Sequence, residues 1–370
     1  MGRGLRERER NIGEAAFGLK TGQPAYRATN IGKKPQGFGT ASIKPGESVQ
    51  VPIGWAIELA GEADWESGRP PSPVTVNDGQ VIQMRRYPGM GDVIFAMTAA
   101  WNLTQRYDDL QIYFDTPAVH HQWVEWVPFI RGIHTREAEN FINFDLIDHC
   151  ANHDRTVEML RCCGVKYKGR HKPKFHMPIN LPDRRAMGFP DLKYALFAPW
   201  ARYHIDPRSI PQTVINEFLR MYKQNFNLPL VIVDRFPTDI PEADQKTIVN
   251  MTGIDPLDTA ELWIAVRDAE YLISTDTGVM HMATTLRTPT LGVFQHIDPM
   301  HRLSLVESPW VAITPDLPCF PCGDGCPHPC EADIGIEPRS CARSVTAHDI
   351  IEGIRKLATK SPEHAEAIYS

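Results

Sequence analysis

After residue 80, short apolar runs alternate with longer amphipathic stretches along most of the chain. The first run, 81–84, leads into the turn Pro88-Gly89-Met90-Gly91, and apolar residues then recur on one helix face from Val93 to Trp101. This pattern predicts a strand, a glycine turn and a helix that begins at Asp92. The glycines allow backbone N–H groups to approach a ligand beside the positive end of the helix dipole. The carboxylate of Asp92 is also explained by a helix N-cap.

The same alternation continues to the end of the chain. Strands are predicted where apolar runs end at polar or proline-containing turns, and helices where apolar residues recur at helical spacing. The predicted strands are 110–114, 141–147, 194–198, 229–233 and 271–274, and the predicted helices include 153–163, 257–269, 279–286 and 345–356. Strands that alternate with helices predict an α/β protein with parallel sheets covered by helices.

A second strand-to-helix turn lies at Thr275-Asp276-Thr277-Gly278. Thr277 and Gly278 would offer backbone N–H groups, and the threonine hydroxyl, to an anion at the helix N-terminus. His281 follows in the first helical turn, within reach of the same anion. The alternative is a capped helix with a packed histidine.

Residues 1–79 differ in composition from the rest of the chain, which indicates a separate N-terminal region. Residues 1–37 carry an excess of about five positive charges, and the stretch 42–52 alternates like a short strand after a Pro-Gly turn. We therefore predict a basic arm and a small β-rich appendage in 1–79. A first α/β domain follows in 80–185 and a second in 186–345, with a Cys-rich loop at 319–341, and a C-terminal helix and tail occupy 346–370.

The overall composition is that of an ordinary soluble globular protein, with 42% hydrophobic and 23% charged residues. A formal net charge of −6 argues against a globally basic nucleic-acid binder. No apolar run reaches the length of a membrane span, and the N-terminus lacks the apolar core of a secretory signal. We expect a cytoplasmic protein whose membrane contact, at the inner face, is at most peripheral.

Five of the eight cysteines crowd into one segment rich in proline and glycine: Cys319, Cys322, Cys326, Cys330 and Cys341. In a reducing compartment such a cluster indicates a metal site or free thiols before a disulfide framework. The spacing of the first four is close to that of structural zinc sites, but a clean pair of Cys-x-x-Cys motifs is missing. Structural zinc and free or paired thiols both remain open. A catalytic thiol is disfavoured because no activating base is evident.

Three motifs in order resemble glycosyltransferase family 9, which contains the ADP-heptose:lipopolysaccharide heptosyltransferases. The first is Gly89-Met-Gly-Asp-Val-Ile94. The second is the segment 274–283, continued by Arg287-Thr-Pro-Thr-Leu-Gly-Val-Phe294 and Asp298-Pro299. The third is Cys319-x-x-Cys322, which is similar to a segment of many members. The resemblance covers roughly 80–358 and leaves the first 79 residues unexplained.

The resemblance implies a GT-B architecture, in which two Rossmann-like domains face each other across a cleft and a C-terminal helix crosses back. It also implies inverting transfer from a nucleotide-diphosphate sugar, for which catalysis requires no metal or other cofactor. Asp92 matches the family position proposed as general base, and Asp276 matches a donor-sugar contact. The diphosphate contacts match Thr277, Gly278 and His281, and Gly91 belongs to the donor-binding turn of the first motif.

Two departures from the family pattern leave questions open. Family members often carry a phosphate-binding Lys that opens a Lys-x-Trp-Pro stretch, and here Arg208-Ser-Ile-Pro211 fits the spacing, with Arg86 or Arg202 as alternatives. The β-rich appendage is not typical, so the acceptor is open among a glycolipid core, a protein, a small molecule and modified nucleic acid. Two other functions remain in view: a nucleotide-sugar hydrolase or epimerase, and a non-catalytic binding or assembly protein that uses the appendage.

Overall fold

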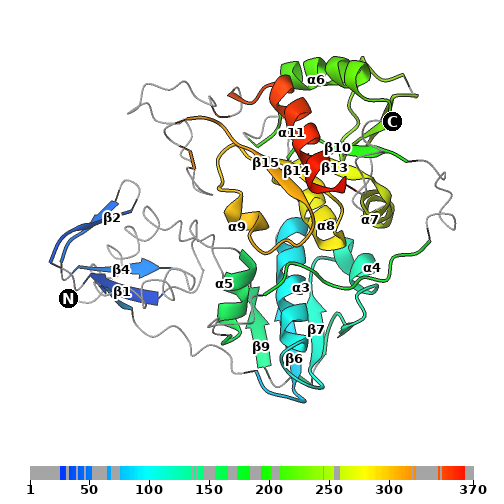
Figure 1. Ribbon diagram of the computed structural model, residues 1–370. Coiled ribbons are helices and arrows are strands. Elements are labelled where there is room, and N and C mark those ends of the chain that lie inside the picture. Colours follow the sequence, from blue (N-terminus) through cyan, green and yellow to red (C-terminus); the bar gives the residue numbers. More distant parts are fainter. Residues whose placement is uncertain are drawn as a thin grey trace.

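Two α/β units and a set of short N-terminal strands form the part of the chain that the computed structural model describes (Figure 1). The described residues are 26–30, 33–38, 41–45, 47–51, 65–67, 76–87, 89–135, 137–138, 140–144, 155–165, 173–183, 193–201, 208–244, 246–253, 259–317, 320–321, 341 and 344–362. Among them, no helix combines the length and the apolar character needed to cross a membrane.

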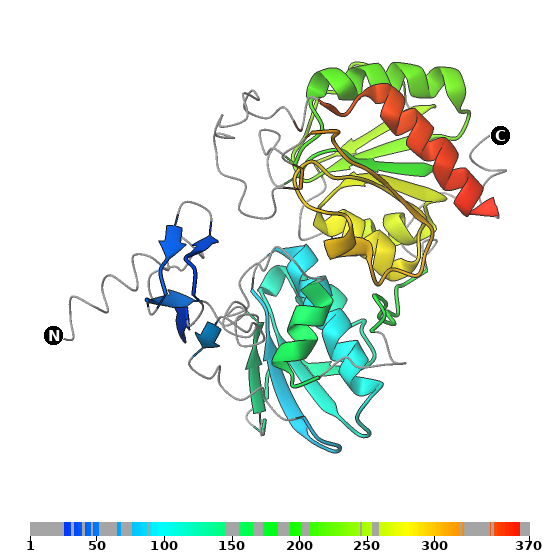
Figure 2. The same cartoon turned by 60° about the vertical axis from the view of Figure 1, so that its left-hand side comes forward.

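The N-terminal strands form two small antiparallel sheets beside the first α/β unit (Figure 2). One sheet has the order β4-β1-β5 and the other pairs β2 with β3. Their bounds are β1 Tyr26–Asn30, β2 Gln36–Phe38, β3 Ala41–Ile43, β4 Ser48–Val51 and β5 Trp65–Ser67. The buried Asn30 side chain donates to the carbonyl groups of Lys34 and Ile43, so it ties a strand of one sheet to a strand of the other.

The first α/β unit contains a parallel four-stranded sheet in the order β8-β7-β6-β9. Its strands are β6 Val81–Arg85, β7 Gln111–Asp115, β8 Ile130–Gly132 and β9 Asn140–Asn143, and its helices are α3 Met90–Thr104, α4 His121–Val124 and α5 Arg155–Cys162, with a 3-10 turn at Ala118–His120. The alternate strand residues Ile82, Met84, Ile112 and Phe114 are fully buried, as the period of two along a strand requires for a face covered by helices.

The second α/β unit contains a parallel six-stranded sheet in the order β12-β11-β10-β13-β14-β15. Its strands are β10 Ala195–Ala198, β11 Leu230–Asp234, β12 Ile248–Thr252, β13 Tyr271–Thr275, β14 Thr290–Val293 and β15 Trp310–Ile313, and its helices are α6 Gln212–Asn225, α7 Thr259–Asp268, α8 Gly278–Leu286, α9 Met300–Leu303 and α11 Ala347–Lys360. Counted along the chain, this is the 3-2-1-4-5-6 order of a Rossmann sheet.

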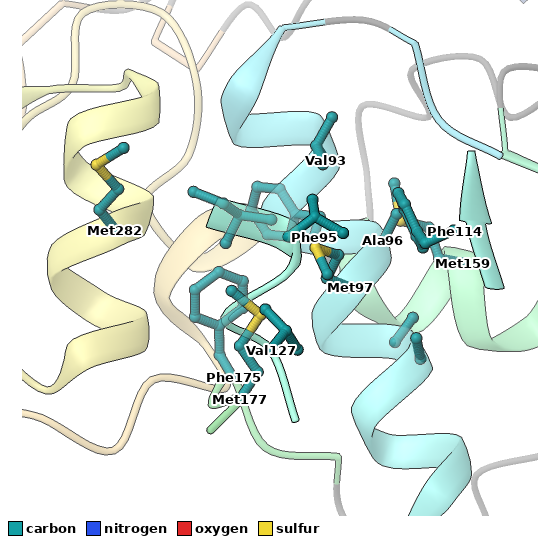
Figure 3. Close-up of a cluster of buried hydrophobic side chains, with 14 of the residues drawn as sticks. Val93, Phe95, Ala96, Met97, Phe114, Val127, Met159, Phe175, Met177 and Met282 are labelled. Atoms are coloured by element: carbon teal, nitrogen blue, oxygen red, sulfur yellow. The ribbon is translucent and has the colours of Figure 1, made fainter. Parts of the chain in front are cut away.

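One apolar core extends from the first unit into the second. Figure 3 shows Phe95 and Met97 of α3, Phe175 of the connector 173–183 and Met282 of α8 in the same buried cluster. Trp123 of α4 also packs on Trp263 of α7, with ring centroids 5.2 Å apart. The helices α3 and α8 therefore lie between the two sheets, whereas α6 and α11 cover the outer face of the second sheet (Figure 1).

The structure differs from the sequence predictions in several local features. Helix α3 begins at Met90 after the N-cap residue Gly89, so Asp92 lies in its first turn and the N-cap explanation for Asp92 is wrong. The sequence patterns do not predict the short strands β8, β12, β14 and β15. The buried residues of α11 belong to the core of the second unit, and this helix covers that unit's own sheet instead of crossing back to the first.

Candidate active site

Both sheets have a topological switch point, where the order of the strands reverses. In the second sheet it lies between β10 and β13, and in the first between β6 and β9. Ligands of open parallel sheets bind beyond the carboxyl ends of the strands at such a point. Arg208 follows β10 and Asp276 follows β13, whereas Arg86 and then Asp92 follow β6. The topology thus explains why these side chains lie together.

The two glycine turns are in direct contact. A Cβ atom added to Gly278 would lie 3.3 Å from the amide nitrogen of Gly91 and 3.2 Å from the Cβ of Met90. A Cβ atom added to Gly91 would lie 2.7 Å from Cδ2 of His281. The first turns of α3 and α8 therefore approach each other as closely as the absence of side chains allows.

Neither helix start is capped by a side chain. The N-cap residues Gly89 and Thr277 make no side-chain cap hydrogen bond, and the hydroxyl of Thr277 instead lies 3.2 Å from that of Ser274. The first N–H groups of a helix have no partner inside the helix, so an anion placed between the two starts could accept from both. The predicted ligands Gly91, Thr277 and Gly278 lie at this junction.

Asp92 is held by two arginines through the same oxygen. Nη2 of Arg86 lies 3.3 Å from Oδ1, and Nη1 of Arg155 contacts Oδ1 as well. Arg86 also donates through Nη1 to the carbonyl oxygen of Phe144 and is only 2% exposed. Arg86, which the sequence offers as an alternative phosphate ligand, therefore pairs with Asp92. Two guanidinium groups favour the ionised carboxylate.

Asp276 is buried among three basic groups. Nε of Arg302 lies 3.4 Å from Oδ2, Nε2 of His281 lies 3.3 Å from Oδ1, and Nη1 of Arg208 lies 3.5 Å from the backbone carbonyl oxygen of Asp276. Burial alone would raise the pKa of Asp276, but Arg302, His281 and Arg208 outweigh it and hold that pKa well below its usual range. Asp276 is therefore ionised.

His281 is neutral in the same environment. Burial lowers its pKa and the neighbouring carboxylate of Asp276 only partly opposes this effect. The imidazole packs edge-on against Phe95, with centroids 4.5 Å apart. Within the described part of the chain, Nδ1 of His281 and Oδ1 of Asp276 are buried without a well-aligned hydrogen-bond partner. Buried polar atoms of this kind are rare and suit a site that a ligand completes.

The charges around the two turns are unequal. The guanidinium groups of Arg86, Arg155 and Arg302 contact the carboxylates of Asp92 and Asp276, and that of Arg208 contacts the backbone carbonyl group of Asp276. Four positive charges against two negative ones leave an excess of two among these residues. Such an excess, beside two helix N-termini, matches an anion of about two charges. A diphosphate group has this charge and can accept bidentate hydrogen bonds from arginine.

Sequence reasoning missed two of these arginines. Arg155 starts α5 and Arg302 lies in the short helix α9, so both are distant in sequence from the carboxylates they contact. Arg302 follows closely after the Asp298-Pro299 pair that carried part of the family resemblance. The Arg302 side chain is only 5% exposed, and the burial of an arginine can be recognised only from a three-dimensional structure.

Five of the remaining candidate residues lie outside the described residues: Arg202 and the cysteines 319, 322, 326 and 330. Cys341 is described and buried. Within the described ranges, no group of three or more His, Cys, Asp or Glu residues is arranged to hold a metal ion.

Two Rossmann-like units whose switch-point turns meet define the GT-B class of fold, that of many nucleotide-sugar glycosyltransferases. A model of the family "Glycosyltransferase family 9 (heptosyltransferase)" matches residues 239–326, which include the Asp276 turn. No curated protein sequence matches the chain. The family match confirms the resemblance that the sequence motifs indicated.

Solved structures of the family share the fold at low sequence identity. The iron-containing dodecameric glycosyltransferase TibC from enterotoxigenic E. coli superposes with a TM-score of 0.59 at 16% identity, over 82% of this chain and 84% of that one. A family 9 glycosyl transferase from Veillonella parvula gives 0.55 at 12%, over 78% and 100%. ADP-heptose LPS heptosyltransferase II of E. coli gives 0.54 at 12%, over 76% and 99%. The GT-B expectation is confirmed, and the findings support a glycosyltransferase.

Proposed function

We propose that this glycosyltransferase moves a sugar from a nucleotide-diphosphate sugar to an acceptor hydroxyl with inversion at the anomeric carbon. The observation that carries the proposal is the contact between Gly91 and Gly278, because it joins a carboxylate in the first turn of one helix to an anion-binding turn at the start of another. Asp92 supplies the base, and the start of α8, with Thr277, Gly278 and His281, holds the diphosphate.

The chemical step requires one base and no covalent intermediate. The acceptor oxygen attacks the anomeric carbon from the face opposite the diphosphate, and its proton passes to the carboxylate of Asp92. The bond between the anomeric carbon and the diphosphate oxygen breaks, and the nucleoside diphosphate leaves with its electron pair. Arg208, which follows β10 and contacts the backbone carbonyl group of Asp276, would stabilise the charge that develops on this leaving group.

The nucleotide portion would extend along the carboxyl edge of the second sheet. Asp234 ends β11, the strand next to β10, and an acidic residue at this position contacts the ribose in dinucleotide-binding Rossmann folds. An ADP-linked donor is favoured by the solved complexes of TibC with ADP-D-beta-D-heptose and of the E. coli heptosyltransferase WaaC with ADP-2-deoxy-2-fluoro heptose. The acceptor stays open among the classes named above.

A structural metal at Cys319, Cys322, Cys326 and Cys330 remains part of the proposal. The spacing of these cysteines is close to that of structural zinc sites, and the description of TibC as iron-containing makes iron a second candidate metal. A cytoplasmic location, which we also propose, would keep these thiols reduced and available to the metal. The chemistry written above uses no metal.

Thermal-shift measurements with ADP-, UDP-, GDP- and CMP-sugars identify the donor. With that donor, Asp92→Asn should lower transfer by about 10²–10⁴-fold, because it removes the proton acceptor, and should leave nucleotide affinity nearly unchanged. Asp78→Asn, an exposed carboxylate on the turn before β6, is the control and should keep full activity. Unchanged transfer in Asp92→Asn would reject the base, and the absence of any response to nucleotide sugars would reject the donor site.

A further inference from the structure

The two arginines that contact Asp92 are buried, which costs desolvation free energy and suggests a role beyond stability. Arg86 and Arg155 come from different elements, the end of β6 and the start of α5, yet both contact Oδ1 of Asp92. Each is almost fully buried. Removal of buried guanidinium groups from water is costly even when they are paired, so this arrangement is weak evidence for a purely stabilising role.

The neighbourhood of Asp92 suggests another role. Among the described residues, the side chains that face this carboxylate include Arg86 after β6, Arg155 from α5 and His281 from α8, and His281 is neutral. Because Gly91 and Gly278 touch, a diphosphate at the start of α8 would lie next to Asp92. A nearby anion favours the protonated form of a carboxylate, and a protonated Asp92 could not accept the proton of an acceptor.

We propose that Arg86 and Arg155 are positioning residues that keep Asp92 ionised and aimed at the acceptor while the anionic donor is bound. This inference rests on the proposed function, since it takes Asp92 as the base and the start of α8 as the diphosphate site. The arginines act through Asp92 and need not touch the substrate. Their two charges offset the charge of the diphosphate at the moment when the base must remain free of a proton.

The two arginines differ in how well they can be tested. Arg86 also supports the carbonyl group of Phe144, so its replacement would leave a buried acceptor without its donor. Arg155 lies at the helix start and is the better target. Arg155→Met removes the charge and keeps much of the volume, whereas Arg155→Lys keeps the charge.

The experiment measures proton uptake on ligand binding. ADP is titrated into the full-length protein by calorimetry at pH 6 in two buffers of different ionisation enthalpy, and GDP, UDP and inorganic pyrophosphate are used in the same way. The wild type should take up no more protons than Asp92→Asn. Arg155→Met should take up additional protons, on the order of a few tenths per ligand, because loss of a neighbouring cation raises a carboxyl pKa by about 1–3 units. Arg155→Lys should restore the wild-type value.

Two further variants assign the proton and control for the loss of charge. In the double variant Asp92→Asn/Arg155→Met the additional uptake should disappear. Arg131→Met removes an exposed arginine of β8 and should behave as the wild type. A merely structural role of Arg155 would lower the unfolding temperature and the affinity without changing proton uptake.

The outcomes separate the inference from the proposed function. If a ligand binds but Arg155→Met takes up no additional proton, the inference is overturned and the donor site stands. If the additional uptake persists in the double variant, the proton goes to another group and the inference is again overturned. If none of the four ligands binds the wild type, both the proposed function and the inference that rests on it are rejected.

Discussion

Gly278 touches Gly91 across the boundary between the two α/β units, so that a Cβ atom on Gly278 would lie 3.3 Å from the amide nitrogen of Gly91. This contact fixes the distance between the first turns of α3 and α8, and hence between Asp92 and the Asp276–His281 pair. Pairs of buried side chains usually keep helix axes 8–10 Å apart, so glycines are the means by which two helix starts can share one small ligand.

Alanine at either glycine should disturb the site. Gly278→Ala brings a methyl group within 3.3 Å of the backbone of Gly91, and Gly91→Ala forces the buried ring of His281 to move. We expect each to lower the free energy of unfolding by about 1–3 kcal/mol and nucleotide-sugar turnover by roughly tenfold or more. Gly132→Ala, which meets only ordinary contacts with Tyr113, is the matched control. Denaturant unfolding and turnover measurements would contradict the prediction if all three variants behaved alike.

Arg302 should stabilise the fold by compensating the buried carboxylate of Asp276. Arg302→Met leaves that carboxylate with His281 and Arg208, and we expect a loss of about 3–5 kcal/mol, as when one partner of a buried ion pair is removed. The double variant Asp276→Asn/Arg302→Met should recover part of the loss because it removes the uncompensated charge. Arg287→Met, which breaks an exposed pair with Glu307, is the control and should cost less than about 1 kcal/mol. Additive losses in the double variant would show that the two residues do not interact.

His120 should make the fold less stable in acid. Burial, assisted by the neighbouring His121, lowers the pKa of His120 to about 4, and its Nδ1 accepts a hydrogen bond from the indole of Trp123. Because the folded-state pKa lies below the unfolded value of 6.5, the unfolded chain binds more protons between the two values. The contribution, on the order of 3 kcal/mol, is therefore complete above pH 6.5 and lost as the pH falls towards 4.

Denaturant unfolding of the wild type and of His120→Gln at pH 7, 5.5 and 4.5 measures this dependence. The variant should lose stability less steeply towards acid than the wild type. His348→Gln, at an exposed position in α11, should retain the wild-type slope. Parallel curves for the wild type and His120→Gln would contradict the assignment to His120.

The cysteine-rich segment should hold one metal ion per chain. Elemental analysis of purified protein for zinc and iron should find one of the two near one equivalent, and Cys322→Ser should lose it, since a four-ligand site rarely tolerates the loss of a thiolate. Cys162→Ser changes a cysteine of α5 outside this segment and should keep the metal. Protein that contains neither metal when prepared under reducing conditions would favour free thiols.

The sequence could reveal the two turns because each is a local pattern. A buried strand, glycines and a helix face occupy about twenty consecutive residues around Asp92, and the same order recurs around Asp276. Patterns of this kind also predicted the parallel sheets. The exact helix start at Met90 could not be predicted, because sequence patterns define the ends of an element less well than its existence.

The arginine contacts could not be predicted, for a physical reason. Arg155 is separated from Asp92 by 63 positions, and no local rule tells which buried carboxylate an arginine will meet. The edge strands β12 and β15 were missed because they are short, and β12 has exposed residues in its middle. Its pairing with β11 is determined by the neighbouring strand more than by its own sequence.

The hydrophobic core that extends between the two sheets determines whether the two α/β units can be produced separately. Phe175 of the connector lies in the same buried cluster as Phe95 of α3 and Met282 of α8, and Trp123 covers Trp263. If the two α/β units were expressed separately, each would expose a large hydrophobic surface to water. We therefore expect them to aggregate or to associate with one another. An exchange of the second α/β unit between relatives should therefore include the facing surfaces of α3 and α4.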